Sequence, residues 1–134
     1  VIANHKALGI KRAIKLPVSA PFHCRLMEKA RENMESYIQD LDLLSPKLIL
    51  VNNVGAAPLT EINKIKDSLV EQITNTVRWR ESIDNMCDLG VDNFIEIGAG
   101  NVLSGLVKRI NKTVNSSSIQ NIENIENYIN ILEG

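Results

Sequence analysis

The stretch F-I-E-I-G-A-G-N-V-L-S-G-L-V-K-R-I, residues 94–110, decides the fold class. Residues 94–97 form a short apolar run of side chains that favour strands. The glycines within residues 98–101 mark a turn. Residues 102–110 then repeat apolar side chains at helical spacing and end with Lys108 and Arg109, where cations suit the end of a helix. A strand, a tight loop and a helix in this order are typical of an α/β fold.

Segments before this unit continue the alternation of strands and helices. Residues 48–51 indicate a buried parallel strand that ends in a loop at Asn52 and Asn53. Three other segments repeat apolar side chains at helical spacing, which predicts amphipathic helices. Their apolar positions are Leu26, Ala30, Met34, Tyr37 and Leu41; Ile62, Ile65, Leu69, Val70 and Ile73; and Trp79, Ile83, Met86 and Leu89. Pro46 prevents continuation of the first helix, and Gly90 caps the third.

The two ends of the chain differ from its middle. Residues 1–3 and 13–16 indicate short strands. Residues 115–118, N-S-S-S, indicate a polar break between elements. The isoleucines that follow have helical spacing but are separated by many asparagines and glutamates, so we expect a final amphipathic helix that docks weakly.

Composition excludes several classes of function. The 134 residues are enough for one domain, and 15 basic and 16 acidic side chains are interspersed along them. A net charge of -1 argues against a nucleic-acid-binding surface. Because the sequence shows no signal peptide and no long apolar stretch, we expect a cytoplasmic protein that makes no use of a membrane. Cys24 and Cys87 lie in separate segments and are expected to remain reduced.

The segment L-P-V-S-A-P-F-H-C-R-L-M, residues 16–27, holds one histidine in a turn stiffened by two prolines. Pro17 and Pro21 push the residues before them toward extended geometry, so His23 stands just before a helix begins. A histidine on a rigid loop is a candidate general base, and the alternative is a hydrogen-bonded surface histidine. Cys24 is a poor candidate nucleophile for His23, because adjacent side chains usually point apart.

Four segments, in this order, resemble the malonyl-CoA:acyl carrier protein transacylases. They are V-S-A-P-F-H-C-R-L-M at residues 18–27, V-N-N-V at 51–54, V-E-Q-I-T-N-T-V-R-W at 70–79 and I-E-I-G-A-G-N-V-L-S-G-L-V-K-R-I at 95–110. The resemblance runs from about residue 13 to residue 110 and implies a member of this acyltransferase family.

The resemblance implies an α/β fold: the C-terminal part of an α/β-hydrolase-like acyltransferase domain at residues 17–134. Residues 1–16 would be a remnant of the family's ferredoxin-like small subdomain, although only residues 5–12 connect its two strands where relatives carry a full helix. No G-x-S-x-G occurs, so the chain lacks the family's serine nucleophile, and Val1 in place of a methionine agrees with a partial chain.

The resemblance also implies roles for individual residues. His23 matches the catalytic base, which activates the serine and later the incoming phosphopantetheine thiol. Gln72 matches the position whose backbone carbonyl orients that imidazole, so replacing its side chain should do little; the alternative is a polar residue on a helix face. Phe22 matches a position where an aromatic ring accompanies malonyl selection, a role compatible with core packing. Asn52 and Asn53 are expected to bind loop backbone near the site.

Other kinds of site find little support. The glycines at residues 98–101 lack the G-x-G-x-x-G spacing of a nucleotide-binding turn, and Ala99 departs from the family's usual Gly-Pro-Gly. His5 and His23 share no ligand spacing, so we expect neither a metal nor a resident cofactor. None of the arginines matches the family's arginine for the malonyl carboxylate.

The resemblance therefore predicts an S-malonyltransferase of fatty acid biosynthesis. Its substrates would be malonyl-CoA and phosphopantetheinylated acyl carrier protein, and its partner in catalysis would be the missing N-terminal half. Without a serine nucleophile, this chain alone should not transfer malonyl. The alternative is a catalytically silent remnant or a module that binds carrier protein.

Overall fold

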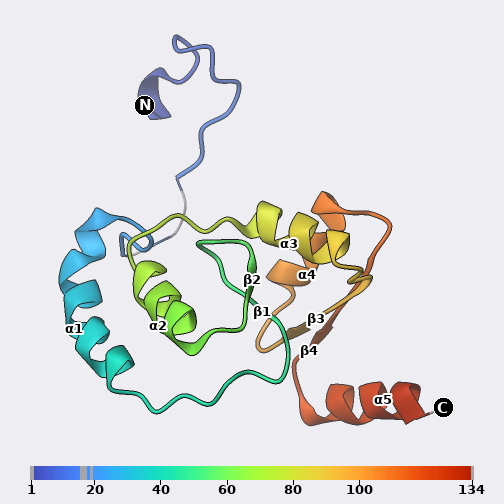
Figure 1. Ribbon diagram of the computed structural model, residues 1–134. Coiled ribbons are helices and arrows are strands. Elements are labelled where there is room, and N and C mark those ends of the chain that lie inside the picture. The colour runs from blue at the N-terminus through green and yellow to red at the C-terminus, as the bar shows by residue number, and fades with distance from the viewer. Residues whose placement is uncertain (1, 16–17, 19, 134) are drawn as a thin grey trace.

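The computed structural model describes residues 2–15, 18 and 20–133 (Figure 1). Helices and short strands alternate along most of this length. Two single 3₁₀ turns, η1 and η2, lie at Ile2–Asn4 and Arg25–Met27. The other elements are α1 (Glu28–Gln39), β1 (Leu50–Val51), β2 (Pro58–Leu59), α2 (Ile62–Glu71), α3 (Trp79–Asp88), β3 (Asn93–Ile97), α4 (Val102–Ile110), β4 (Asn115–Ile119) and α5 (Ile122–Glu133).

The β3–α4–β4 unit confirms the strand, loop and helix predicted for residues 94–110. β3 and β4 pair in parallel, with Asn93 opposite Asn115 and Ile97 opposite Ile119. α4 connects the two strands and packs on them (Figure 1), and its Val107 is buried. This is the crossover that parallel strands require.

The polar break predicted at residues 115–118 is wrong, because these residues form most of β4. Serine favours strands only weakly, but pairing with β3 satisfies its backbone. The hydroxyl of Ser116 donates to the carbonyl oxygen of Ser104 at 3.3 Å, and the hydroxyl of Ser104 lies 3.0 Å from the carbonyl oxygen of Ser117. Tertiary contacts with α4 thus override the local preference.

The buried parallel strand predicted at residues 48–51 is also wrong. β1 contains only two residues and pairs antiparallel with β2, Leu50 opposite Leu59. The side chains of Leu48 and Ile49 are 82 % and 60 % exposed. A parallel strand is buried only when neighbouring strands and helices cover it, and within the described residues β1 pairs with β2 alone.

The three predicted helices before β3 are confirmed as α1, α2 and α3. In α1, however, Ile38 is the buried apolar side chain, while Met34 and Tyr37 of the predicted apolar stripe are exposed. α1 packs against α2, where Ile65 and Val70 are buried as predicted. Ile83 of α3 is fully buried. Gly90 follows α3 with φ +92°, a left-handed conformation that suits glycine after a helix.

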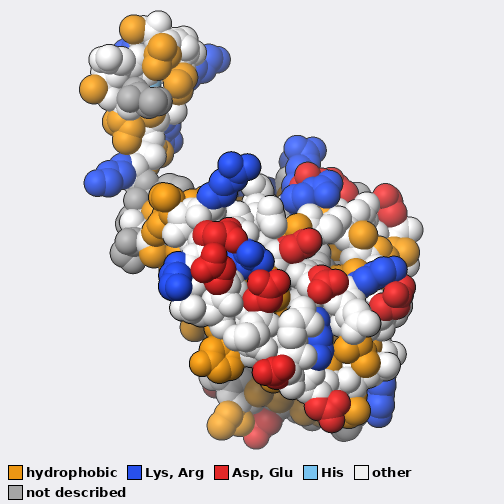
Figure 2. Space-filling model, turned by 60° about the vertical axis from the view of Figure 1, so that its left-hand side comes forward, with side chains coloured by type: hydrophobic (Ala, Val, Ile, Leu, Met, Phe, Trp, Pro, Cys, Tyr) orange, Lys and Arg blue, Asp and Glu red, His pale blue; other side chains and the backbone are white. Residues whose placement is uncertain are grey.

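The two ends of the chain pack loosely. Residues 2–15 stand away from the rest of the molecule (Figures 1 and 2). The strands predicted there are wrong within the described residues: Ile2–Asn4 is a 3₁₀ turn and residues 13–15 pair with no strand. At the other end, α5 confirms the weakly docked helix, since Ile122 and Ile131 are 73 % and 74 % exposed.

The surface mixes charges of both signs. Figure 2 shows acidic and basic side chains interspersed over one face of the molecule. Ion pairs also form along helices, such as those of Arg31 with Glu28 and Glu35. Among the helices that the structure describes, none combines the length and the apolar character needed to span a membrane.

Candidate active site around His23

His23 lies on a turn that hydrogen bonds of the neighbouring residues hold in place. Its φ of +59° is in the left-handed region, which costs an L-residue with a β-carbon roughly 1–2 kcal/mol. After it, the thiol of Cys24 donates to the carbonyl oxygen of Pro21 at 3.2 Å, and the N–H of Met27 donates to Cys24 at 3.0 Å. Pro17 of the expected turn lies outside the described residues. A strained conformation that the surroundings maintain is typical of functional sites.

The structure brings His23 and Gln72 together, as the resemblance implied. Nδ1 of His23 lies 2.8 Å from the backbone carbonyl oxygen of Gln72, although 49 residues separate the two in sequence. A carbonyl oxygen can only accept, so Nδ1 carries the proton and Nε2 of the neutral ring is left as the acceptor. The exposed imidazole therefore has the tautomer that a general base requires.

The carbonyl of Gln72 is available because α2 ends there. Gln72 caps α2, and its N–H donates back to Ser68 at 3.0 Å. The next N–H groups, those of Ile73 and Thr74, turn back to Val70 and Glu71. The last carbonyls of a helix have no partner within it. His23 takes one of these, at the negative end of the helix dipole.

A cavity of about 360 Å³ opens beside this pair. Its walls are formed by Phe22, His23, Met27, Leu69, Gln72 and Ile73. Phe22 is 62 % exposed, so in this chain its ring does not pack in the core. The ring instead stands next to His23 in the wall of an apolar recess.

Asn52 and Asn53 hold the loop after β1. Asn52 is buried, and its side-chain oxygen accepts from the N–H of Gly55 at 2.7 Å, which is the backbone contact expected of it. The carbonyl of Asn53 accepts from the N–H of Arg78 at 2.7 Å. In addition, Nδ2 of Asn53 donates to the side-chain oxygen of Gln72 at 3.3 Å. No local pattern indicated that last contact, because 19 residues separate the partners.

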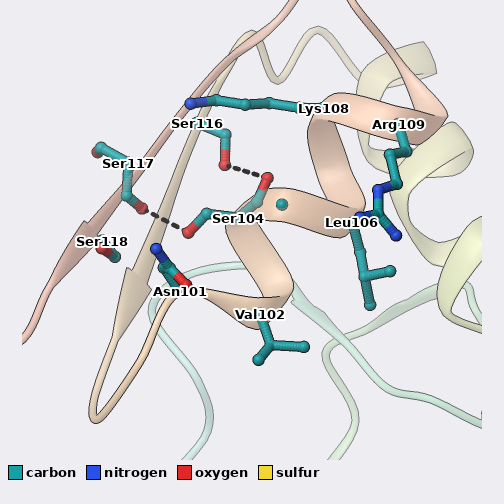
Figure 3. A pocket seen from close by; sticks show the side chains of 10 residues that line it. Asn101, Val102, Ser104, Leu106, Lys108, Arg109, Ser116, Ser117 and Ser118 are labelled. Carbon is teal, nitrogen blue, oxygen red and sulfur yellow. Dashed lines mark hydrogen bonds between the residues drawn. The ribbon is translucent and has the colours of Figure 1, made fainter.

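A second cavity, of about 450 Å³, lies between α4 and β4 (Figure 3). Ser104 stands at its centre, hydrogen-bonded to Ser116 and Ser117, and Lys108 extends across it toward β4. The hydroxyl of Ser116 is thus already bonded to the carbonyl oxygen of Ser104, and the hydroxyl of Ser118 accepts from the side chain of Gln120.

Beside this cavity, at the turn of residues 98–101 and the start of α4, hydrogen bonds within the protein already use amides that a phosphate would bind. The Glu96 carboxylate accepts from the hydroxyl and the N–H of Ser104, at 2.7 and 2.8 Å, and from the N–H of Leu103 at 3.2 Å. These bonds, led by the hydroxyl, lower the pKa of Glu96. The N–H of Gly100 donates to the side chain of Gln120. A phosphate at this turn would compete with Glu96 and Gln120 for these same amides.

Among the described residues, no three side chains of His, Cys, Asp or Glu gather closely enough to bind a metal ion. Cys24 and Cys87 are both free thiols. At the described site, the His23 imidazole can supply acid–base chemistry.

No protein-family model matches the chain. It is, however, 41 % identical over 128 residues to the malonyl CoA-acyl carrier protein transacylase of Staphylococcus aureus (strain COL). The match covers 96 % of this chain and 42 % of that protein. The chain is a partial homologue of the malonyl-CoA:acyl carrier protein transacylases. It thus spans less than half the length of the curated relatives it matches.

Solved structures of transacylases agree with this relationship. An acyl-carrier-protein-S-malonyltransferase from Bartonella henselae superposes with a TM-score of 0.87 and 38 % identity, covering 99 % of this chain and 42 % of that one. The solved complex of a type II PKS acyl-carrier protein with its malonyl-transacylase contains a chain that matches with a TM-score of 0.85 and 34 % identity. The match covers 94 % of this chain and 41 % of the solved chain. This homologue therefore has a mixed α/β fold that matches part of the acyltransferase fold.

Proposed function

We propose that this transacylase homologue supplies the base of an S-malonyltransferase, which moves malonyl from coenzyme A to acyl carrier protein. The observation that carries the proposal is the 2.8 Å bond from Nδ1 of His23 to the carbonyl of Gln72, beside an open cavity. It leaves Nε2 of a neutral imidazole as the acceptor for a proton. The nucleophile is a serine of a G-x-S-x-G segment, which the 134 residues do not contain.

In this proposal His23 handles the proton in both halves of the reaction. Nε2 takes the serine proton while the serine oxygen bonds to the thioester carbonyl carbon of malonyl-CoA. The carbon–sulfur bond then breaks, and the coenzyme A sulfur leaves with that proton, which leaves a malonyl ester on serine. Nε2 next takes the proton of the phosphopantetheine thiol, whose sulfur displaces the serine oxygen; the serine recovers the proton. Gln72 keeps the ring oriented throughout.

Phe22 is proposed to favour malonyl over larger acyl groups. Its ring stands in the cavity wall next to His23. There it would occupy the space that a methyl group on C2 of the acyl chain needs. One methyl group is worth about 1–3 kcal/mol of discrimination in such a recess.

The remaining part of the site is proposed to come from the N-terminal half of a family member. The match to 42 % of each of these relatives supports this, as do the exposed apolar side chains of Leu48 and Ile49 just before β1. That half would complete an α/β-hydrolase-like large subdomain, and residues 1–16 would belong to the ferredoxin-like small subdomain. Carrier protein would be the partner, as in the solved transacylase complex, and the site of action would be the cytoplasm.

The second candidate function is a catalytically silent remnant or a carrier-protein-binding module. The lack of a G-x-S-x-G segment within the 134 residues favours it. Such a chain would keep the fold, or the fold and a carrier-protein surface, without the chemistry. The two candidates therefore differ in malonyl transfer by a completed protein.

A chimera tests the proposal. The chain replaces the corresponding 42 % of the Bartonella henselae enzyme, and transfer of malonyl to phosphopantetheinylated carrier protein is measured. We expect transfer by the chimera, none by the chain alone, and a loss of about 10²–10⁴-fold on His23→Ala. His5→Ala is the matched control and should leave the rate unchanged, since Nδ1 of His5 bonds only its own turn, at the carbonyl of Ile2.

Two outcomes would decide against the proposed base or the proposed enzyme. Transfer that survives His23→Ala would reject His23 as the base. A folded chimera without transfer, which still binds carrier protein, would support the silent module instead.

A further inference from the structure

We infer that Asn53 is a positioning residue for His23, and that it acts through the side chain of Gln72. The inference rests on the proposed function of His23 as a base. It assigns a role to a side-chain contact that neither the sequence pattern nor the resemblance indicated.

Two consecutive hydrogen bonds connect Asn53 to the imidazole. Nδ2 of Asn53 donates to Oε1 of Gln72 at 3.3 Å, and the backbone oxygen of the same Gln72 accepts from Nδ1 of His23 at 2.8 Å. Asn53 and Gln72 are both half-buried, whereas His23 is exposed. The connection therefore runs from the interior of the loop toward the surface.

Asn53 is itself firmly held. Its carbonyl accepts from the N–H of Arg78, the residue that caps α3, at 2.7 Å. The neighbouring Asn52 is buried, and its side chain binds the N–H of Gly55. The hydroxyl of Ser82, on α3, lies 3.4 Å from the carbonyl of Asn52. The donor to Gln72 is thus fixed to the body of the molecule at several points.

Gln72 needs such a fixed donor because it is the residue that caps the end of α2. Its N–H is bonded back to Ser68, but beyond it the backbone leaves the helix in a series of turns. Rotation at the end of a helix changes where its carbonyl points, and a side chain anchored to a second element opposes that rotation. A hydrogen-bond partner behind the group that orients a histidine fixes the ring and its tautomer.

A consequence contradicts the expectation that the side chain of Gln72 can be replaced freely. Gln72→Met has a similar shape but removes the acceptor for Asn53, whereas Gln72→Glu keeps an oxygen acceptor at the same place. If the connection positions the carbonyl, these two variants should behave differently.

Nitrogen-15 NMR of the histidine rings in the full chain tests the inference directly, because it distinguishes the two tautomers of His23. In the unaltered chain we expect the Nδ1–H form to dominate. Asn53→Leu and Gln72→Met should each reduce it to a minor form, and the double variant should do no more than either single change. Gln72→Glu should keep it dominant.

Asn75→Ala is the matched control. Nδ2 of Asn75 donates to the carbonyl of Glu71 at 2.9 Å, at the same end of α2 but outside the connection. It should leave the His23 tautomer unchanged. Circular dichroism reports whether each variant folds, and if Asn53→Leu does not, the comparison of Gln72→Met with Gln72→Glu decides the question.

Equal tautomer ratios in Gln72→Met and Gln72→Glu would overturn the inference and leave the proposed function standing. The experiments can also support the inference while they reject the proposed function. If the tautomer responds as expected but the chimera transfers malonyl without His23, the positioning contact is real and the proposed function is wrong.

Discussion

Ile83→Ala tests whether α3 is the element that anchors this structure. Ile83 is the largest side chain that is fully buried among the described residues, and α3 begins beside the Arg78 N–H that holds Asn53. The substitution removes three carbon groups, worth about 0.8 kcal/mol each in transfer alone. With the residual cavity the total loss of unfolding free energy is about 2–5 kcal/mol.

Urea unfolding followed by fluorescence measures this loss, because the sequence has a single tryptophan and Trp79 lies on α3 itself. With a denaturant dependence of about 2 kcal/mol per M, the midpoint should fall by roughly 1–2.5 M. Leu89→Ala is the control: its side chain is 53 % exposed at the end of the same helix, and the change should cost under ~0.5 kcal/mol. Equal midpoints for the two variants would refute the assignment of the core.

Three other perturbations follow from the site and its supports. Gly100→Ala should destabilise by about 1–2 kcal/mol because φ is +93°, whereas Gly105→Ala, inside α4 with open space around it, should stabilise by about 0.5–1 kcal/mol; thermal unfolding compares them. The lowered pKa of Glu96 adds stability above its unfolded pKa that is lost as pH falls through the folded value, and Ser104→Ala should raise that pKa in an NMR titration. In the chimera, Phe22→Ala should reduce the kcat/KM preference for malonyl-CoA over methylmalonyl-CoA by about 5- to 100-fold; an unchanged ratio would remove Phe22 from selectivity.

The elements that are stabilised by their own residues could be predicted from the local sequence. The strand, turn and helix of residues 94–110 were predicted closely, because the glycines at the turn adopt positive φ and the helix has a continuous apolar face. The helices α2 and α3 were predicted for the same reason. In these segments, hydrophobic periodicity and turn chemistry agree with each other.

Elements that depend on distant partners were predicted poorly. β4 is rich in serine and becomes a strand only because β3 lies beside it. Leu48 and Ile49 have the composition of a buried strand but lack the neighbours that would bury them.

The site shows the same division. His23 could be singled out from its proline-rich turn, but its pairing with Gln72, 49 residues away, came from family resemblance rather than from periodicity. The contact of Asn53 with the Gln72 side chain became visible only in three dimensions.

The left-handed backbone at His23 also has an evolutionary consequence. Glycine adopts a φ of +59° without the steric cost that histidine bears, so backbone strain alone would favour a glycine at this position. The bond of the imidazole to Gln72 and any use of the imidazole oppose that substitution. Related chains that still use a proton acceptor here should retain histidine. Chains that have lost this use should accumulate glycine or asparagine. The residue at position 23 therefore indicates whether the chemistry has been kept.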